Sequence, residues 1–253
     1  MAEVAAYLTE LCRRVQATVE VVGIYAGGSY ALGAYQPGSS DLDVAGVTRG
    51  PLAQEEKDEL VAQLRHEALP CPARRLEAVF YSATDAASTG VAPAYQLNLN
   101  TGAGTALHVD REPKPGEGFW FAIDRAILHD HGVALVGPPA QAVFGSIPRR
   151  LLLPVIADAL SWHFEGATST SDSVLNACRA LRFAVSGDWS SKASAGWWAL
   201  DYVGEREVVR QALAARTGGP QPTKRAAHAF LGSILEEIEL VQALESRRVR
   251  AGA

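Results

Sequence analysis

Cysteine is scarce in this chain, and its scarcity excludes two common ways of stabilising a fold. Only Cys12, Cys71 and Cys178 occur among 253 residues, an odd number with no C-x-x-C spacing. The sequence therefore indicates neither a disulfide framework nor a cysteine-based zinc site. A hydrophobic core must hold the fold instead, and 48% hydrophobic residues are enough for one large domain or two of ordinary size.

Long hydrophobic runs are also lacking. The longest ones, such as residues 151–156, are far shorter than the roughly 20 residues that cross a bilayer. Met1 is followed by an amphipathic pattern and not by the charged and apolar regions of a signal peptide. We therefore expect a cytoplasmic protein that has no membrane partner.

Positive charge is in deficit too. Four lysines accompany nineteen arginines, and the formal net charge is −5. Proteins that bind nucleic acid usually carry a basic stripe for the phosphate backbone, so this balance argues against a nucleic-acid partner. It suits a cationic ligand better, and it makes each well-placed lysine a candidate for function.

A Gly-Ser turn after a buried strand is the first positive signal. Residues 19–26 are mostly apolar and β-branched, which predicts a strand, and Gly27 and Gly28 end it where the backbone must come close to another group. A short helix is predicted over residues 30–35, directly after Ser29. The free N–H groups at its start would favour a phosphate.

Three carboxylates follow on two predicted strands. In residues 41–47 the period of two puts Asp41 and Asp43 on one face. Glu77 interrupts the apolar and aromatic strand 75–82, where a carboxylate is costly unless it is paired or bound to metal. Such a cluster beside a phosphate-binding turn predicts a Mg²⁺ site and a base for an attacking hydroxyl. The alternatives are a solvated strand end for the aspartates and a water-facing edge strand for Glu77.

The order of elements predicts an α+β protein of two domains, residues 1–148 and 149–253. In the first domain, helices are expected over residues 2–19, 51–69 and 119–131, strands over 19–26, 41–47, 75–82, 94–100 and 133–136, and a loop over 101–118. In the second, apolar residues at helical spacing predict a helical bundle with segments 149–164, 171–186, 192–203, 206–216 and 225–245.

Several blocks of the sequence resemble a known family. Residues 28–47 (GSYALGAYQPGSSDLDVAGV) resemble the signature of the nucleotidyltransferase superfamily. Further blocks at residues 76–79, 119–124 with 131–138, 174–179 and 191–200 resemble the aminoglycoside 3''/9-nucleotidyltransferases, which are streptomycin/spectinomycin adenylyltransferases. The resemblance implies a polymerase-β-like nucleotidyltransferase domain followed by a helical domain. It also implies the activity: Mg²⁺-dependent transfer of AMP from ATP to a drug hydroxyl, with release of pyrophosphate.

The resemblance further implies roles for individual residues. In the first domain these are nucleotide binding for Gly28, Ser29 and Ser40, Mg²⁺ binding for Asp41 and Asp43 together with Glu77, the general base role for Glu77, and contact with the cationic drug for Asp124. From the second domain, Arg179 and Lys192 are expected to reach the nucleotide phosphates across an interdomain cleft. The plainer alternatives are an exposed helix arginine, a lysine that starts a helix, and a surface or capping role for Asp124.

Departures from the family pattern concern the acceptor. Members that accept streptomycin carry a tryptophan after the fourth strand and an acid before the arginine-bearing helix, which align here with Gly102 and Ser169. A family tyrosine near the nucleotide falls around Thr217 and Gly218, where no aromatic is present. We therefore expect spectinomycin to be favoured over streptomycin.

Other functions remain open at the level of sequence. One alternative is a nucleotidyltransferase that acts on another small hydroxylated metabolite. A toxin–antitoxin type of nucleotidyltransferase is disfavoured, because such proteins are short and lack a second domain carrying Arg179 and Lys192. A catalytically inactive binding protein is disfavoured by intact Asp41, Asp43 and Glu77. We expect a monomer.

Overall fold

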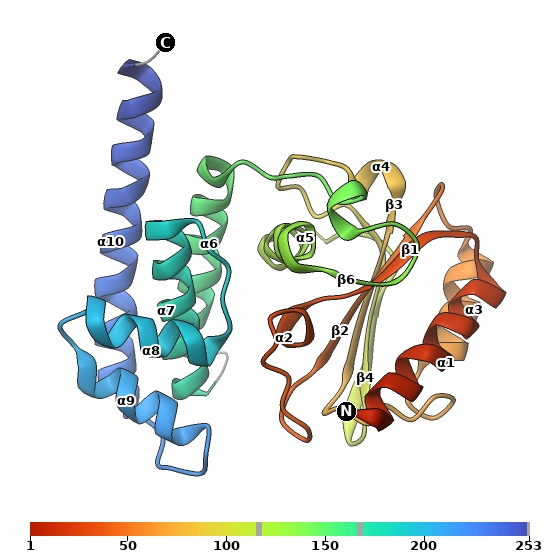
Figure 1. Ribbon diagram of the computed structural model, residues 1–253, viewed down its shortest axis with the longest axis horizontal. Coiled ribbons are helices and arrows are strands. Elements are labelled where there is room, and N and C mark those ends of the chain that lie inside the picture. The colour runs from red at the N-terminus through yellow and green to blue at the C-terminus, as the bar shows by residue number, and fades with distance from the viewer. Residues whose placement is uncertain (115–117, 166–168, 252–253) are drawn as a thin grey trace. The chain divides into compact units, whose positions relative to one another are not determined.

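The protein forms two compact units, Met1–Ile147 and Pro148–Ala253, in a computed structural model that describes residues 1–114, 118–165 and 169–251 (Figure 1). The first unit contains a mixed sheet with helices, and in the second unit the described residues form helices joined by loops, without strands. The predicted α+β class is therefore confirmed. Among the described helices, none is long and apolar enough to cross a membrane.

The strands of the first unit make one sheet. Within the described residues it has six strands in the order β5-β4-β3-β2-β1-β6. Their bounds are β1 Val21–Ala26, β2 Leu42–Thr48, β3 Leu76–Ser82, β4 Tyr95–Gly102, β5 Thr105–Asp110 and β6 Val133–Val136. Strands β2 and β3 are parallel and every other neighbouring pair is antiparallel. The parallel pair at the centre carries Asp43 on β2 and Glu77 on β3.

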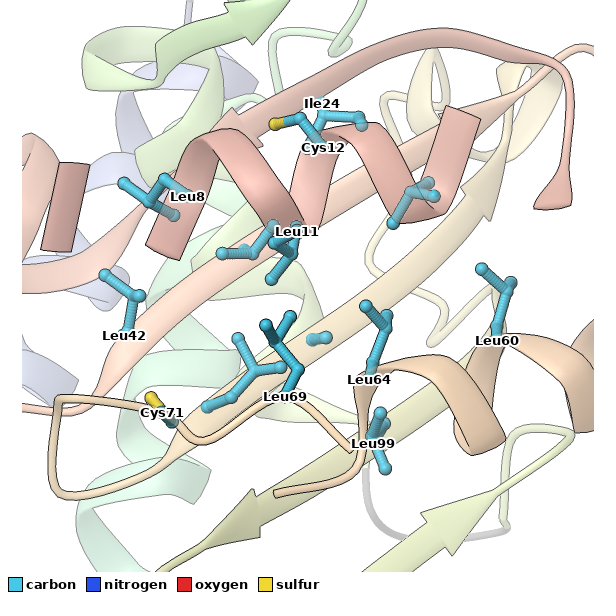
Figure 2. Close-up of a cluster of buried hydrophobic side chains, with 14 of the residues drawn as sticks. Leu8, Leu11, Cys12, Ile24, Leu42, Leu60, Leu64, Leu69, Cys71 and Leu99 are labelled. Atoms are coloured by element: carbon cyan, nitrogen blue, oxygen red, sulfur yellow. The ribbon is translucent and has the colours of Figure 1, made fainter. Parts of the chain in front are cut away.

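One face of the sheet is buried under α1 (Ala2–Thr18) and α3 (Gln54–Leu64), which pack beside each other. Figure 2 shows Leu64 of α3 next to Leu99 of β4, and both belong to one buried cluster with Leu11 of α1 and Leu42 of β2. All four side chains are buried. This core fixes which side chains of β2, β3 and β4 point to the opposite face, because successive residues of a strand alternate.

The opposite face is covered along part of its length by α5 (Phe119–His131), together with the short helices α2 (Gly28–Ala31) and α4 (Ala83–Ala86) (Figure 1). Phe121 and Leu128 of α5 pack against Tyr25, Tyr81 and Tyr95 of the sheet. The strand ends that lie beyond this cluster carry polar residues and are only half-buried. They form the floor of the candidate site.

The hairpin of β4 and β5 corrects the loop predicted over residues 101–118. Strand β4 extends to Gly102, Gly104 turns the chain with φ +67°, and β5 follows as an edge strand. Four of the six β5 side chains are exposed, so the strand lacks the buried alternation by which strands are recognised in sequence. Residues 115–117 of the predicted loop lie outside the described residues.

The second unit is built around α7 (Thr170–Ser186). This helix contacts each of the other four helices, α6 (Arg149–Phe164), α8 (Lys192–Tyr202), α9 (Arg206–Ala215) and α10 (Lys224–Ala251). The approach of α8 is close, because a Cβ added at Gly196 would lie 2.7 Å from Leu175 and 2.9 Å from Leu213. The short 3-10 helix η1 (Ala140–Ala142), which precedes α6 in the chain, belongs to the first unit.

Candidate active site

The Gly-Ser turn lies directly against Asp43. The Gly27 amide donates a hydrogen bond to the backbone carbonyl of Asp43 at 2.9 Å. Gly28 has φ +49°, and a Cβ added there would lie 1.8 Å from Asp43 Oδ2. Only glycine fits both the backbone conformation and the space. Helix α2 therefore begins at Gly28 and ends at Ala31, which is earlier than the predicted span of residues 30–35.

The two serines of the motif have different surroundings. Ser29 Oγ is buried and has no hydrogen-bond partner among the described residues. A buried hydroxyl without a partner is costly, so Ser29 is suited to bind a ligand oxygen. Ser40 Oγ accepts a hydrogen bond from the Gln36 amide at 2.9 Å, which closes the loop before β2. Ser40 therefore stabilises the conformation of the loop before β2.

Asp43 and Glu77 stand side by side on the two central strands. The parallel register pairs Asp43 with Glu77, so both side chains project from the same face of the sheet. Asp41 differs from the prediction, because β2 begins at Leu42 and leaves Asp41 in the preceding loop. The three carboxylates are nevertheless linked electrostatically, since Glu77 interacts with the charges of both aspartates.

Two arginines that sequence reasoning passed over hold this cluster. Arg74 donates to both oxygens of Asp41 at 2.7 and 2.6 Å. Arg75 Nη2 lies 3.2 Å from Asp41 and also contacts Glu77. The sequence does contain a signal for this pairing, since two adjacent arginines directly precede β3. Cations next to a predicted carboxylate cluster are expected to pair with it.

Glu77 is poised between its two protonation states near neutral pH. Burial raises the pKa of its carboxyl to about 7, and the negative charge of Asp43 adds to the increase, while Arg75 opposes it. Its side chain is still 30% exposed, so a ligand can reach it. A carboxyl with these properties suits proton transfer at physiological pH.

The carboxylates fit a hard divalent cation by chemistry. All their donor atoms are oxygens, and Glu77 and Asp43 crowd like charges that a cation would neutralise. Among the described residues no group of three acidic, histidine or cysteine side chains is already arranged to hold a metal ion. Asp41 is instead held in ion pairs with Arg74 and Arg75, which draw its carboxylate toward the arginines.

Asp124 lies on α5, one helical turn before Leu128. Leu128 contacts the Gly-Ser turn, since a Cβ added at Gly27 would lie 3.2 Å from it. Residues four apart share a helix face, so Asp124 is on the side of α5 that faces the turn. Its side chain is exposed. Burial raises the pKa of Tyr81 and the charge of Asp124 adds to that rise, so Asp124 lies close to β3, the strand that carries Glu77.

In the second unit, Lys192 interacts with the charges of Asp172, Arg179 and Arg216. Lys192 Nζ forms an ion pair with Asp172 at 2.7 Å, and Arg179 donates to Asn176 at 3.4 Å. Burial lowers the pKa of Lys192, Asp172 opposes that decrease, and the charges of Arg179 and Arg216 add to it. Sequence reasoning missed Asp172 and Arg216. Lys192, Arg179 and Arg216 therefore lie close enough for their charges to interact, and a group of cations attracts an anion.

Comparisons with known proteins agree with this geometry. Residues 4–83 match the nucleotidyltransferase domain, so the turn and the carboxylates of the first unit define a nucleotidyltransferase. Residues 142–238 match the C-terminal domain of aminoglycoside adenylyltransferases. With both matches in their order along the chain, the protein belongs to the aminoglycoside adenylyltransferase family, which confirms the resemblance seen in the sequence.

One solved structure supports the fold. The crystal structure of the spectinomycin adenyltransferase AAD(9) from Enterococcus faecialis, with ATP and spectinomycin, matches with a TM-score of 0.70. The match covers 92% of this chain and 98% of the other, at 15% sequence identity. At this identity the similarity shows a shared fold. No curated protein sequence matches the chain.

Proposed function

We propose that the protein transfers AMP from ATP to a hydroxyl of an aminocyclitol or aminoglycoside antibiotic, with spectinomycin favoured over streptomycin, and releases pyrophosphate. The observation that carries the proposal is the pairing of Asp43 with Glu77 beside the Gly28 turn. The pairing supports the proposal, because burial raises the pKa of Glu77 to about 7, a value suited to accepting a proton. ATP and spectinomycin accompany the structurally similar AAD(9).

The first unit would bind the nucleotide and activate the acceptor. Gly28 and Ser29 would contact the triphosphate, and Ser40 would assist from the loop before β2. Asp41, Asp43 and Glu77 would hold Mg²⁺, which supplies charge neutralisation for displacement at the α-phosphorus. Glu77 would take the proton of the acceptor hydroxyl as that oxygen attacks. The buried Ser29 hydroxyl and the raised pKa of Glu77 support these roles.

The second unit would contribute cations to the phosphates. Lys192 and Arg179 are the proposed ligands, and the electrostatic interaction between them supports the idea, because a phosphate would reduce the repulsion between two neighbouring cations. Asp124 is proposed to attract the cationic drug. Its exposed position on the face of α5 that carries Leu128 supports this role.

The preference for spectinomycin rests on two positions. A Cβ at Gly102 would lie 2.6 Å from the Arg74 carbonyl and 2.7 Å from Arg75, so no larger side chain fits there without a backbone shift. Ser169 is the N-cap of α7, where its hydroxyl accepts a hydrogen bond from the Asp172 amide. Neither position can supply the aromatic ring or the charge that we associate with streptomycin.

A substrate panel tests the proposed function. With Mg·ATP, pyrophosphate release is expected with spectinomycin and to a smaller extent, if at all, with streptomycin. Preferential use of streptomycin would show that the interpretation of Gly102 and Ser169 is wrong. Inactivity with every aminocyclitol and aminoglycoside would favour another small hydroxylated acceptor.

Replacing Lys192 by alanine is expected to weaken ATP binding by about tenfold or more, because a charge-assisted hydrogen bond to a phosphate is lost. Isothermal calorimetry of ATP with the full chain measures this. Lys224→Ala is a matched control, since Lys224 also opens a helix and is exposed. Equal ATP affinity in Lys192→Ala and Lys224→Ala would remove Lys192 from the nucleotide site.

A further inference from the structure

A row of polar side chains extends from Glu77 across the edge of the sheet. In β4, Leu97 and Leu99 are buried in the core, and Asn98 and Asn100 alternate with them. The register pairs Asn100 with Glu77. Paired residues on neighbouring strands project from one face with Cβ atoms about 5 Å apart. Asn100 is therefore the neighbour of the proposed base on the side away from Asp43.

The row continues onto β5 as a chain of hydrogen bonds. Asn100 pairs with His108 in the register, and Asn98 pairs with Asp110. Asn100 Nδ2 donates to Asn98 Oδ1 at 3.1 Å, and Asn98 Nδ2 donates to Asp110 Oδ2 at 3.3 Å. We call Asn100, Asn98 and Asp110 the amide relay.

The ionised state of Asp110 determines which amide group of Asn98 and Asn100 donates and which accepts in the amide relay. Burial alone would raise the pKa of its carboxyl, but hydrogen bonds from Lys114 and His108 outweigh burial and lower the pKa. Asp110 is thus ionised at neutral pH and can only accept. Asn98 therefore directs its NH₂ group toward Asp110 and its carbonyl toward Asn100. Asn100 directs its NH₂ group toward Asn98. Outside the relay, Asn100 keeps its carbonyl Oδ1 as an acceptor, together with the second N–H of its amide.

This orientation places two acceptors next to each other on the sheet. Asn100 Oδ1 is an acceptor, and the ionised form of Glu77 is another. A neighbouring pair of acceptors complements a ligand that carries adjacent donors, such as a hydroxyl beside a second hydroxyl or an ammonium group. Aminocyclitols present such donors on their rings, and the half-buried surroundings of Asn100 would strengthen the contact.

We propose that Asn100 is an acceptor-binding residue, whose Oδ1 is oriented by Asn98 and Asp110 and accepts a hydrogen bond from the donor adjacent to the hydroxyl that Glu77 deprotonates. This inference rests on the proposed function, because it names a contact with the acceptor of that reaction. Asn98 and Asp110 act through Asn100 and are positioning residues. Gly102, two residues further along β4, leaves no side chain to take this role.

The test separates binding of the acceptor from binding of ATP. Asn100→Ala is expected to raise the KM for spectinomycin on the order of tenfold, as for one lost hydrogen bond in a shielded site, and to leave the KM for ATP unchanged. Asp110→Asn should raise the acceptor KM as well, because an amide at position 110 no longer dictates the direction of the relay. A purely structural role would shift both KM values together.

Leu107→Ala serves as the control on the same hairpin. Leu107 is 47% exposed and, as the neighbour of His108, projects from the other face, so both KM values should stay at wild-type level. If Asn100→Ala lowers the thermal stability, Asn100→Gln keeps the amide chemistry and displaces the carbonyl by one methylene. An acceptor KM that is unchanged in a folded Asn100 variant overturns the inference. Lack of AMP transfer in the wild-type protein would instead overturn the proposed function.

Discussion

Replacing Glu77 by glutamine is expected to reduce turnover about a hundredfold or more, a loss much larger than any change in the affinity for ATP or drug, because Asp41 and Asp43 remain to hold the metal ion. Glutamine has nearly the same shape but cannot accept the proton of the attacking hydroxyl. Single-turnover kinetics together with calorimetry separate the two effects. Turnover that survives in Glu77→Gln would make Glu77 a residue of the strand with no part in the chemistry.

The same variant has a second readout in metal-free buffer. Folding raises the pKa of Glu77 to about 7, so the folded protein holds this proton more tightly than the unfolded chain. The contribution of Glu77 to stability is therefore complete below the ordinary pKa of a glutamate and is lost as the pH rises through 7. Near pH 8, Glu77→Gln should be more stable than the wild type by about 1–3 kcal/mol, and near pH 4 the two should be equal. Thermal unfolding at both pH values measures this difference.

Replacing Asp43 by asparagine is expected to reduce AMP transfer to the background rate without unfolding the protein. A neutral amide is a poor ligand for a hard divalent cation, and Asp43 is the proposed ligand nearest to the Gly28 turn. Asp41→Asn should have the same effect on transfer. Binding of Mn²⁺ as a probe for Mg²⁺, followed by electron paramagnetic resonance, should weaken in both variants.

Asp58 provides the control for these aspartates. It pairs with Arg111 on the surface of the first unit, much as Asp41 pairs with Arg74. Asp58→Asn should leave both Mn²⁺ binding and transfer unchanged, which separates loss of a ligand from loss of an ion pair. Full activity in Asp43→Asn would end the assignment of the metal site.

Much of the fold could be predicted because apolar periodicity records burial. The bounds of α5, β6 and α6 agree with the prediction from the sequence, since each has a clear pattern and a clear stop. Strand β5 could not be predicted in the same way. It lies at the sheet edge with exposed side chains, so its own apolar pattern does not indicate a strand. Pairing with β4 determines its structure.

Some features of the candidate site could likewise be predicted from the sequence, and others could not. The pairing of Asp43 with Glu77 follows from adjacent parallel strands, which the order of elements suggested. The alternation of Asn98 and Asn100 with buried leucines was also visible in the sequence, although its meaning depends on the register with Glu77 and Asp110. The bridge that Arg75 makes between Asp41 and Glu77 depends on side-chain placement, which no spacing rule specifies.

Tracing the phosphorus of ATP tests the central claim most directly. We expect the wild-type protein to move radioactive label from the α-phosphate of ATP onto spectinomycin, and to leave label from the γ-phosphate in pyrophosphate. Glu77→Gln should strongly reduce the labelled drug. Label from the γ-phosphate on the drug would show phosphoryl transfer and would contradict the account.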